Sequence, residues 1–98
     1  MKLLWSELAI ERVTAIASHI NQINPNDTEK WIEKCFDRVL QLKDFPKSGR
    51  IVPELSKTNI REIFYGNYRI IYKLEPTRII IMTLRHSRQT LRARDMES

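Results

Sequence analysis

The apolar positions in the first half of the chain recur with a helical repeat. One ladder has spacings of three and four residues, which place its members on a single stripe of an α-helix: Ala9, Val13, Ile16, Ile20 and Ile23. Ser6 precedes this ladder as an N-cap, so the pattern predicts a helix over residues 6–23. Residues 1–5 form a short apolar segment before the cap, and we expect them to be a strand.

A second helical pattern begins after Asn24-Pro25. Proline disfavours helix in the residue before it, and either Asn26 or Asp27 can cap the helix that we predict over residues 26–43. Its inward side is broad and apolar: Trp31, Ile32, Cys35, Phe36, Val39, Leu40 and Leu42. The two helices are expected to form an antiparallel hairpin that packs on a sheet.

Three segments rich in Ile, Tyr and Phe predict strands over residues 60–65, 68–74 and 78–86. Gly66-Asn67 makes a two-residue hairpin loop, and residues 75–77 close the second hairpin. The three strands therefore form an antiparallel meander.

The two-residue loop also determines which side chains share a face. Tyr65 lies opposite Tyr68 and Arg61 opposite Tyr72 on one face, whereas Arg69 belongs to the other face. The tyrosines are expected to pack against the helices. The fold class is therefore α+β, with the helices on one face of the sheet and the other face left partly open as a working surface.

Charge divides the chain unevenly. The 98 residues include 17 Lys and Arg against 12 Asp and Glu, and residues 1–49 hold seven of each sign, so the net charge of +5 comes from residues 50–98. The size predicts one domain over residues 1–98, and the charge predicts an acidic partner. The basic segment 87–98 is expected to be a solvated tail or a contact surface, not part of a folded core.

Several classes of function are disfavoured by what the sequence contains. Cys35 is the single cysteine, and no close histidine pair accompanies it, so we expect no disulfide and no metal. Gly49 and Gly66 are the only glycines, so no nucleotide-binding glycine loop is expected and no cofactor either. The longest apolar run, Ile79 to Met82, is too short for a membrane span, and no signal-peptide pattern opens the chain, so the expected location is the cytoplasm with no membrane partner.

Several short motifs follow one another along most of the chain: Leu4-Trp5-Ser6, Asn24-Pro25, Pro46 to Leu55, Ile60-Arg61-Glu62, Gly66 to Tyr72 and Arg85-His86-Ser87-Arg88. In this order and spacing the sequence resembles the RelE/ParE superfamily of toxins from bacterial type II toxin-antitoxin modules. The resemblance implies a RelE/ParE-like fold and a cognate antitoxin whose C-terminal segment wraps the toxin. It also implies a toxin that is monomeric by itself and hetero-oligomeric with the antitoxin.

Two activities occur in this superfamily, and the end of the chain favours one of them. His86-Ser87-Arg88 is similar to the His-x-Arg ending of ParE-like toxins, which inhibit DNA gyrase by protein contact, and no aromatic residue follows Tyr72 as it does in RelE. The resemblance therefore implies a ParE-like gyrase inhibitor. The residues expected to bind the target or the antitoxin are Arg61, Arg69, Lys73, Arg85, His86, Arg88 and Arg92.

The alternative is an enzyme, a RelE- or YoeB-like metal-free endonuclease that cuts mRNA on the ribosome. The resemblance would then make Arg69 the phosphate contact, with Glu54 as general base and His86 as acid or base. Against this, Ile60 and Glu62 stand where RelE carries catalytic lysines. The structural alternatives are that Glu54 pairs with a nearby cation such as Arg50 or Lys57, and that His86 is a hydrogen-bonded strand residue. A third hypothesis is a non-toxic paralogue that still binds an antitoxin.

Overall fold

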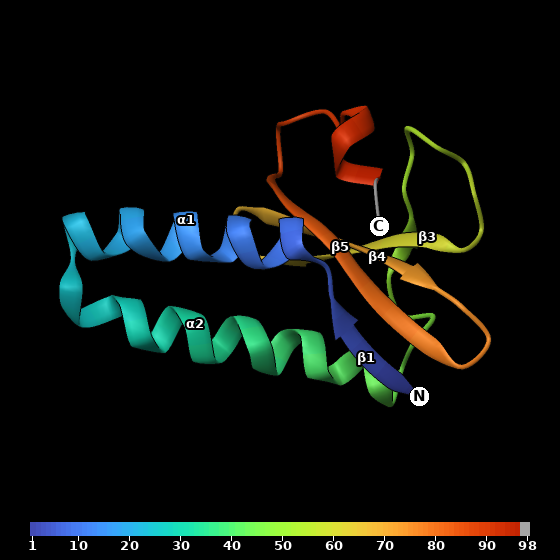
Figure 1. Cartoon of the computed structure of the whole chain (residues 1–98), viewed down its shortest axis with the longest axis horizontal. Helices are drawn as coiled ribbons and strands as arrows, with labels where there is room; N and C mark the ends of the chain where they lie inside the picture. Colours follow the sequence, from blue (N-terminus) through green and yellow to red (C-terminus); the bar gives the residue numbers. More distant parts are fainter. Residues whose placement is uncertain (97–98) are drawn as a thin grey trace.

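Two helices pack on one face of a five-stranded sheet in the computed structural model, which describes residues 1–96 (Figure 1). The elements in chain order are β1 (Lys2–Trp5), α1 (Glu7–Ile23), α2 (Pro25–Leu40), a 3₁₀ turn (Gln41–Lys43), β2 (Arg50–Ile51), β3 (Ile60–Tyr65), β4 (Tyr68–Leu74), β5 (Arg78–His86) and a second 3₁₀ turn (Ala93–Met96). The order across the sheet is β1-β5-β4-β3-β2. The α+β class predicted from the sequence is confirmed. Of the predicted basic segment, residues 97–98 lie outside the described residues.

The sheet is wider than the predicted meander. Strand β1 lies parallel to β5, which the long connection through both helices makes possible, whereas all other strand pairs are antiparallel. The short β2 pairs with β3 at the other edge and lies between the second helix and residue 60, where the sequence predicted no strand. Two residues are too few for a strand pattern, so only the pairing reveals it.

The helix boundaries follow from their caps. The Ser6 hydroxyl accepts a hydrogen bond from the Ala9 amide at 3.0 Å, as predicted, and donates one to the Met82 carbonyl at 2.7 Å, which ties the start of α1 to β5. Helix α2 begins at Pro25 with Asn24 as its N-cap, so the predicted cap at Asn26 or Asp27 is wrong. Proline is favoured as the first helical residue because its missing N–H has no helical partner there anyway.

The helices bury a narrower face than the sequence predicted. Cys35 and Val39 of α2 are buried, but Phe36 and Leu40 are exposed, and so is Ile23 at the end of the α1 ladder. The last turns of α1 and the first of α2 extend beyond the sheet in Figure 1, so apolar residues there have no sheet to cover them. No helix in residues 1–96 has the length and apolar character that crossing a membrane requires.

The predicted register between β3 and β4 is confirmed: Tyr65 pairs with Tyr68 and Arg61 with Tyr72. The hairpin needs a positive φ, which Gly66 supplies at +56°. Between β4 and β5 the register shifts, and Met82 is passed over without a partner on β4. Because of this bulge, the side chains of Met82 and Thr83 both lie on the face of the sheet away from the helices.

The main core lies between the helices and the sheet. The fully buried Tyr72 belongs to it, with Tyr65 packed at its border, as predicted for the tyrosine face. The Tyr72 hydroxyl accepts a hydrogen bond from the Gly49 amide at 3.0 Å and donates one to the Pro46 carbonyl at 2.7 Å. A Cβ on Gly49 would come within 2.7 Å of the Glu62 carbonyl oxygen, so only glycine fits this approach of the connecting loop to the sheet.

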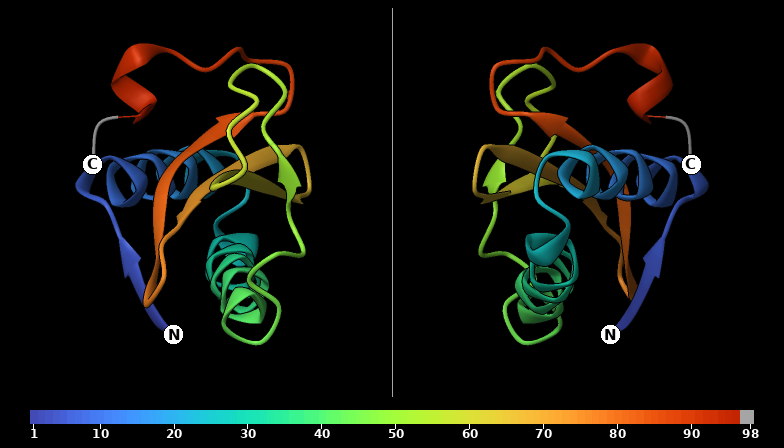
Figure 2. Two further views of the ribbon diagram at one scale, coloured as in Figure 1. Left: turned by 90° about the vertical axis from the view of Figure 1, so that its right-hand side faces the viewer. Right: turned by 90° about the vertical axis from the view of Figure 1, so that its left-hand side faces the viewer.

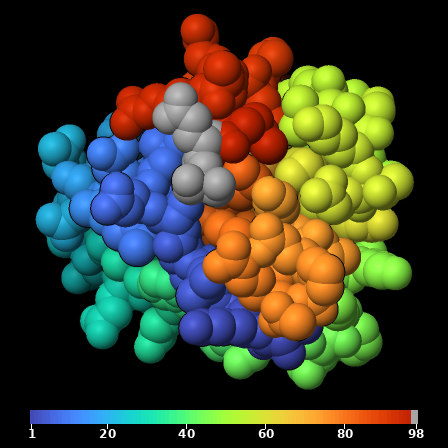
Figure 3. All heavy atoms as spheres, turned by 45° about the vertical axis from the view of Figure 1, so that its right-hand side comes forward, coloured from blue at the N-terminus to red at the C-terminus, as the bar shows by residue number. Residues whose placement is uncertain are grey.

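The opposite face of the sheet is covered, so the prediction of an open working face is wrong. A second apolar cluster contains Val52, Ile60, Ile71, Ile80 and Met82, with Leu55, Leu91 and Met96 packed against it. The loop before β3 and the segment after β5 lie together over this face, on the side of the sheet away from α2 (Figures 2 and 3). Consecutive isoleucines on β4 and β5 were the available signal, because strands buried on both faces lose the apolar–polar alternation.

Candidate functional site

Arg69 is the centre of a buried charge network on the covered face. Its Nε donates to Glu62 at 2.6 Å, and its two terminal nitrogens donate to the two oxygens of Glu54 at 2.8 Å each. A fourth hydrogen bond of 2.9 Å reaches the Gln89 carbonyl in the C-terminal segment. Glu62 has no exposed side-chain surface and is also bound by Arg50 at 2.6 Å. Two carboxylates therefore surround one strand arginine.

Both carboxylate oxygens of Glu54 accept hydrogen bonds within this network. The structural alternative that paired it with Arg50 or Lys57 is wrong, because its carboxylate meets Arg69 instead. The side-chain hydrogen bonds from Arg69 lower the pKa of Glu54 to about 2, with burial opposing this shift and the Leu91 amide supporting it. A carboxylate with such a low pKa is a weak proton acceptor at neutral pH.

Asp95 forms a second network beside the first. Its side chain is fully buried and binds Arg12 at 2.7 Å and Arg85 at 3.0 Å. The Thr83 hydroxyl and the Arg92 amide also donate to it, at 2.9 Å and 2.8 Å. Burial by itself raises the pKa of Asp95, but the hydrogen bonds from Arg85, the Arg92 amide and Thr83, with the charge of Arg12, outweigh it, and the pKa is lowered.

The second network corrects our expectation for the C-terminal segment. Residues 87–96 are not a solvated tail, because Asp95 and Leu91 hold them on the sheet. The amide of Leu91 donates to Glu54 at 3.2 Å, which joins the segment to the first network too. The physical reason is that one buried carboxylate satisfies two arginines from distant elements, a pairing that local sequence patterns do not express.

His86 is separate from both networks. It pairs with Tyr68 across β4 and β5, whereas Arg69 pairs with Arg85, so His86 and Arg69 lie on opposite faces of the sheet. Its ring centroid is 5.9 Å from that of Tyr68 at a steep angle, and its Nδ1 accepts a hydrogen bond of 3.4 Å from the Arg88 amide. Of the three candidate nuclease residues, the structure brings Glu54 and Arg69 together and leaves His86 apart from them.

The remaining candidates lie in different surroundings. Arg61 donates to the carbonyls of Thr58 and Gly49, and Lys73 lies 3.6 Å from Glu75, so both have structural contacts. Arg85 is held by Asp95, whereas Arg88 and Arg92 are exposed. The sequence predictions assigned no structural role to Arg12, Glu62 or Asp95. Glu62 gave one signal, since the predicted register put it on the same face as Arg69. In residues 1–96 no three His, Cys, Asp or Glu side chains gather as metal ligands.

Acid is expected to weaken the fold through these carboxylates. The pKa of Glu54 falls from about 4.3 in an unfolded chain to about 2 in the fold. A group with a lowered folded pKa contributes stability that is complete above its unfolded pKa and is lost as the pH falls through its folded pKa. We therefore expect the urea midpoint to decline from about pH 4.5 toward pH 2. A Glu54→Gln variant should start lower at pH 7 and decline less; an equally steep decline would contradict this assignment.

The helical hairpin packed on a five-stranded sheet is a fold that this chain shares with a solved structure from a toxin-antitoxin system. A solved structure described as "Chromosomal ParDE TA system from P. aeruginosa" aligns with a TM-score of 0.74, at 19% identity, over 88% of this chain and 95% of that one. A family model described as "ParE toxin of type II toxin-antitoxin system, parDE" matches residues 3–91. The chain therefore belongs to the ParE toxin family. The search among curated proteins returned no match.

Proposed function

We propose that this ParE-family toxin inhibits DNA gyrase in the cytoplasm by protein–protein contact and is neutralised by a cognate antitoxin. The observation that carries the choice of target is the engagement of Arg69. A guanidinium has five N–H donors, and Arg69 makes four hydrogen bonds to acceptors of its own chain. With Arg50 also bound to Glu62, the network holds two cations and two carboxylates, so its charges balance and Arg69 offers little attraction to an RNA phosphate.

The geometry gives further support to contact over cleavage. A ribonuclease would need a base and an acid on either side of one phosphate, but Glu54 is ion-paired and His86 lies on the other face of the sheet. Protein recognition needs neither, and no cofactor. Exposed cations such as Arg88 offer a surface for an acidic patch on the target. The toxin acts as a monomer in this proposal and forms a hetero-oligomer with its antitoxin.

The proposal is tested by adding the purified chain to gyrase with relaxed plasmid and, in parallel, to translating ribosomes with a defined transcript. We expect supercoiling to stop while the transcript stays intact. Arg88→Glu should weaken inhibition by about tenfold, because reversing a rim charge mainly slows association, whereas Lys34→Glu on exposed α2 should change it little. Cut transcripts with normal supercoiling would contradict the proposal and favour the endonuclease. If neither assay responds, the chain is a non-toxic paralogue.

Point variants are preferable to a C-terminal truncation in this test. Removing residues 88–98 would take away the buried Asp95 and leave Arg12 and Arg85 without their carboxylate. A truncated chain could lose its effect on gyrase through unfolding alone. Arg88→Glu changes an exposed side chain and avoids that ambiguity.

A further inference from the structure

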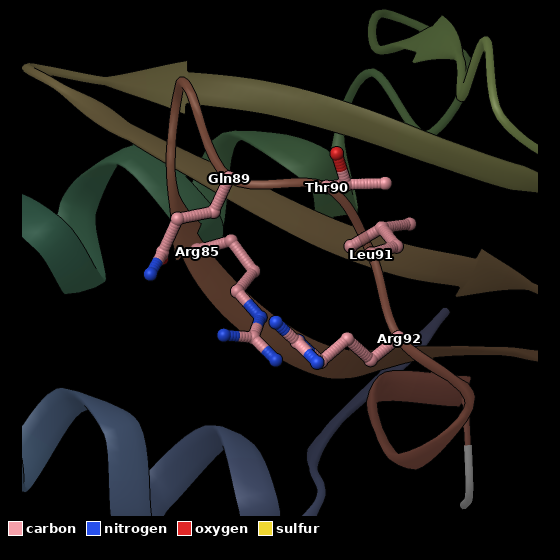
Figure 4. Close-up of a pocket in the computed structure, with 5 residues that line it drawn as sticks. All are labelled: Arg85, Gln89, Thr90, Leu91 and Arg92. Carbon is pink, nitrogen blue, oxygen red and sulfur yellow. The ribbon is translucent and has the colours of Figure 1, made fainter.

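A hollow of about 380 Å³ lies between the end of β5 and the segment that follows it (Figure 4). It is lined by Arg85, Gln89, Thr90, Leu91 and Arg92. The side chains of Arg85 and Arg92 point toward one another in this hollow. Two like charges facing the same space favour an anion between them. The Arg92 guanidinium can donate two parallel hydrogen bonds to a carboxylate, and Arg85, whose Nε and one terminal nitrogen bind Asp95, still has its other terminal nitrogen as a donor.

The charges around the hollow are unbalanced. Arg85 shares the carboxylate of Asp95 with Arg12, and the structure of residues 1–96 gives the Arg92 guanidinium no carboxylate partner. Arg94 contributes another cation, offset by Glu11 at 3.1 Å. Burial lowers the pKa of Arg12, and repulsion from Arg85 and Arg94 acts in the same direction against the attraction of Asp95. The Asp95 carboxylate is thus shared by two guanidiniums, and Arg92 adds a third cation beside them.

An apolar hollow of about 390 Å³ adjoins the basic one. The two share Arg85 and Gln89, and the second is further lined by Arg12, Ala15, Ile16, Tyr68, Leu84 and His86. Because the two hollows share Arg85 and Gln89, we treat them as one groove beside the end of β5. The first hollow is its cationic end, and the second is mainly apolar but also contains Arg12 and His86. An extended peptide with neighbouring acidic and apolar side chains matches this order.

We propose that this groove binds an acidic peptide segment, with one carboxylate between Arg85 and Arg92 and an adjacent apolar side chain over Ala15 and Ile16. The segment comes from the antitoxin, so the inference rests on the proposed function and deepens it by giving the chemistry of one contact. Binding removes the repulsion between the two guanidiniums and buries apolar surface next to the ion pair. An acidic residue there is therefore a specificity determinant of the complex.

The surroundings favour a single carboxylate over a nucleic acid. Glu54 accepts a hydrogen bond from the Leu91 amide at one side of the basic hollow, and Asp95 accepts one from the Arg92 amide at the other. An isolated carboxylate fits between these two acids, but a run of phosphates would meet them and be repelled. The positive potential is local, unlike the continuous basic stripe that follows a nucleic-acid backbone.

The test is a nuclear magnetic resonance titration of the full chain, labelled with ¹⁵N, with three probes. They are the peptide acetyl-Leu-Glu-Leu-amide, its Leu-Gln-Leu counterpart and a ribonucleotide hexamer. We expect the Glu peptide to shift the Nε–H signals of Arg85 and Arg92 and the amides of Gln89 and Thr90 in a saturable way. The Gln peptide should bind at least tenfold more weakly. Equal binding of both peptides, or tighter binding of the hexamer at the same signals, would overturn the proposal.

Variants separate this inference from the proposed function. Arg92→Gln should weaken binding of the Glu peptide at least tenfold, whereas Lys34→Gln, which removes an exposed cation of α2 outside the lining, should leave it within twofold. The same variants are then titrated with the purified product of the adjacent reading frame. If that protein binds wild type and Arg92→Gln equally, the groove is not its site although an antitoxin exists. If it does not bind wild type while the Glu peptide does, the antitoxin proposal fails and the groove stands as an acidic-peptide site.

Discussion

Replacement of Arg69 by alanine is expected to lower the free energy of unfolding by about 3–5 kcal/mol, because it leaves two carboxylates without their shared cation. Glu62 would be the more costly of the two, since its side chain has no exposed surface. For a domain of this size such a loss corresponds to a melting temperature lower by at least about 12 °C. Thermal and urea unfolding, followed by circular dichroism, measure it directly.

Two companion variants make that result specific. Arg88→Ala removes an exposed arginine and should change stability by less than about 0.5 kcal/mol. Adding Glu62→Gln to Arg69→Ala should recover part of the loss, because it replaces a buried carboxylate whose remaining cation partner is the exposed Arg50. An Arg69→Ala protein as stable as wild type would show that the network is not formed as described.

The fate of Arg69→Ala also affects how activity data are interpreted. A loss of transcript cleavage or of gyrase inhibition in this variant cannot be assigned to a direct contact unless the protein is shown to be folded. Arg69 is 5% exposed and lies beneath the C-terminal segment, so a partner reaches it only after that segment moves. Exposed residues such as Arg88 and Arg92 are better tests of recognition.

Replacement of Asp95 by asparagine is expected to cost about 2–4 kcal/mol and to release the end of the chain. The neutral amide cannot hold Arg12 and Arg85 together, although both arginines retain some contact with water, 19% and 14% of their side-chain surface. Amide hydrogen exchange should accelerate over residues 88–96 more than over the helices. Hydrogen exchange therefore measures the loss of stability and also shows which part of the chain is released.

Arg94→Gln is the matched control for Asp95→Asn. It lies in the same 3₁₀ turn and breaks only an exposed ion pair with Glu11, both side chains being 66% exposed, so its effect should stay within about 0.5 kcal/mol. If Asp95→Asn left exchange over residues 88–96 unchanged, the apolar contacts of Leu91 and Met96 and the hydrogen bonds to Arg69 and Glu54 would be enough to hold the segment. The buried Asp95 carboxylate would then have no anchoring role.

Much of the framework was predictable from local patterns. The predicted bounds of β3, β4 and β5 agree with the structure residue for residue, because the strand-forming segments are separated by turn residues whose conformations are themselves local. The cap at Ser6 was predictable for the same reason. The start of α2 was missed by one residue, because proline at the first helical position and asparagine before it compete with later caps.

The candidate site was predictable only in part. The register placed Arg69 and Glu62 on one face, but it could not bring Glu54 to them, because Glu54 lies on a loop whose path depends on the second apolar cluster. His86 belonged to the predicted set because of its place in the closing motif that carries the family resemblance. Successive side chains of β5 point to opposite faces of the sheet, so His86 lies on the face away from Arg85 and Arg69 and is separate from the Arg69 network.

The sequence by itself determined the helices, strands β1, β3, β4 and β5, the register of β3 with β4 and the positive charge of the second half, because each depends on neighbours within a few positions. Only the tertiary structure decided that the second sheet face is covered and that Asp95 and Glu54 neutralise arginines from distant elements. The reason is that a buried ion pair forms wherever two segments meet once the apolar surfaces have packed. Which segments come together depends on the fold as a whole, so no local sequence pattern predicts these ion pairs.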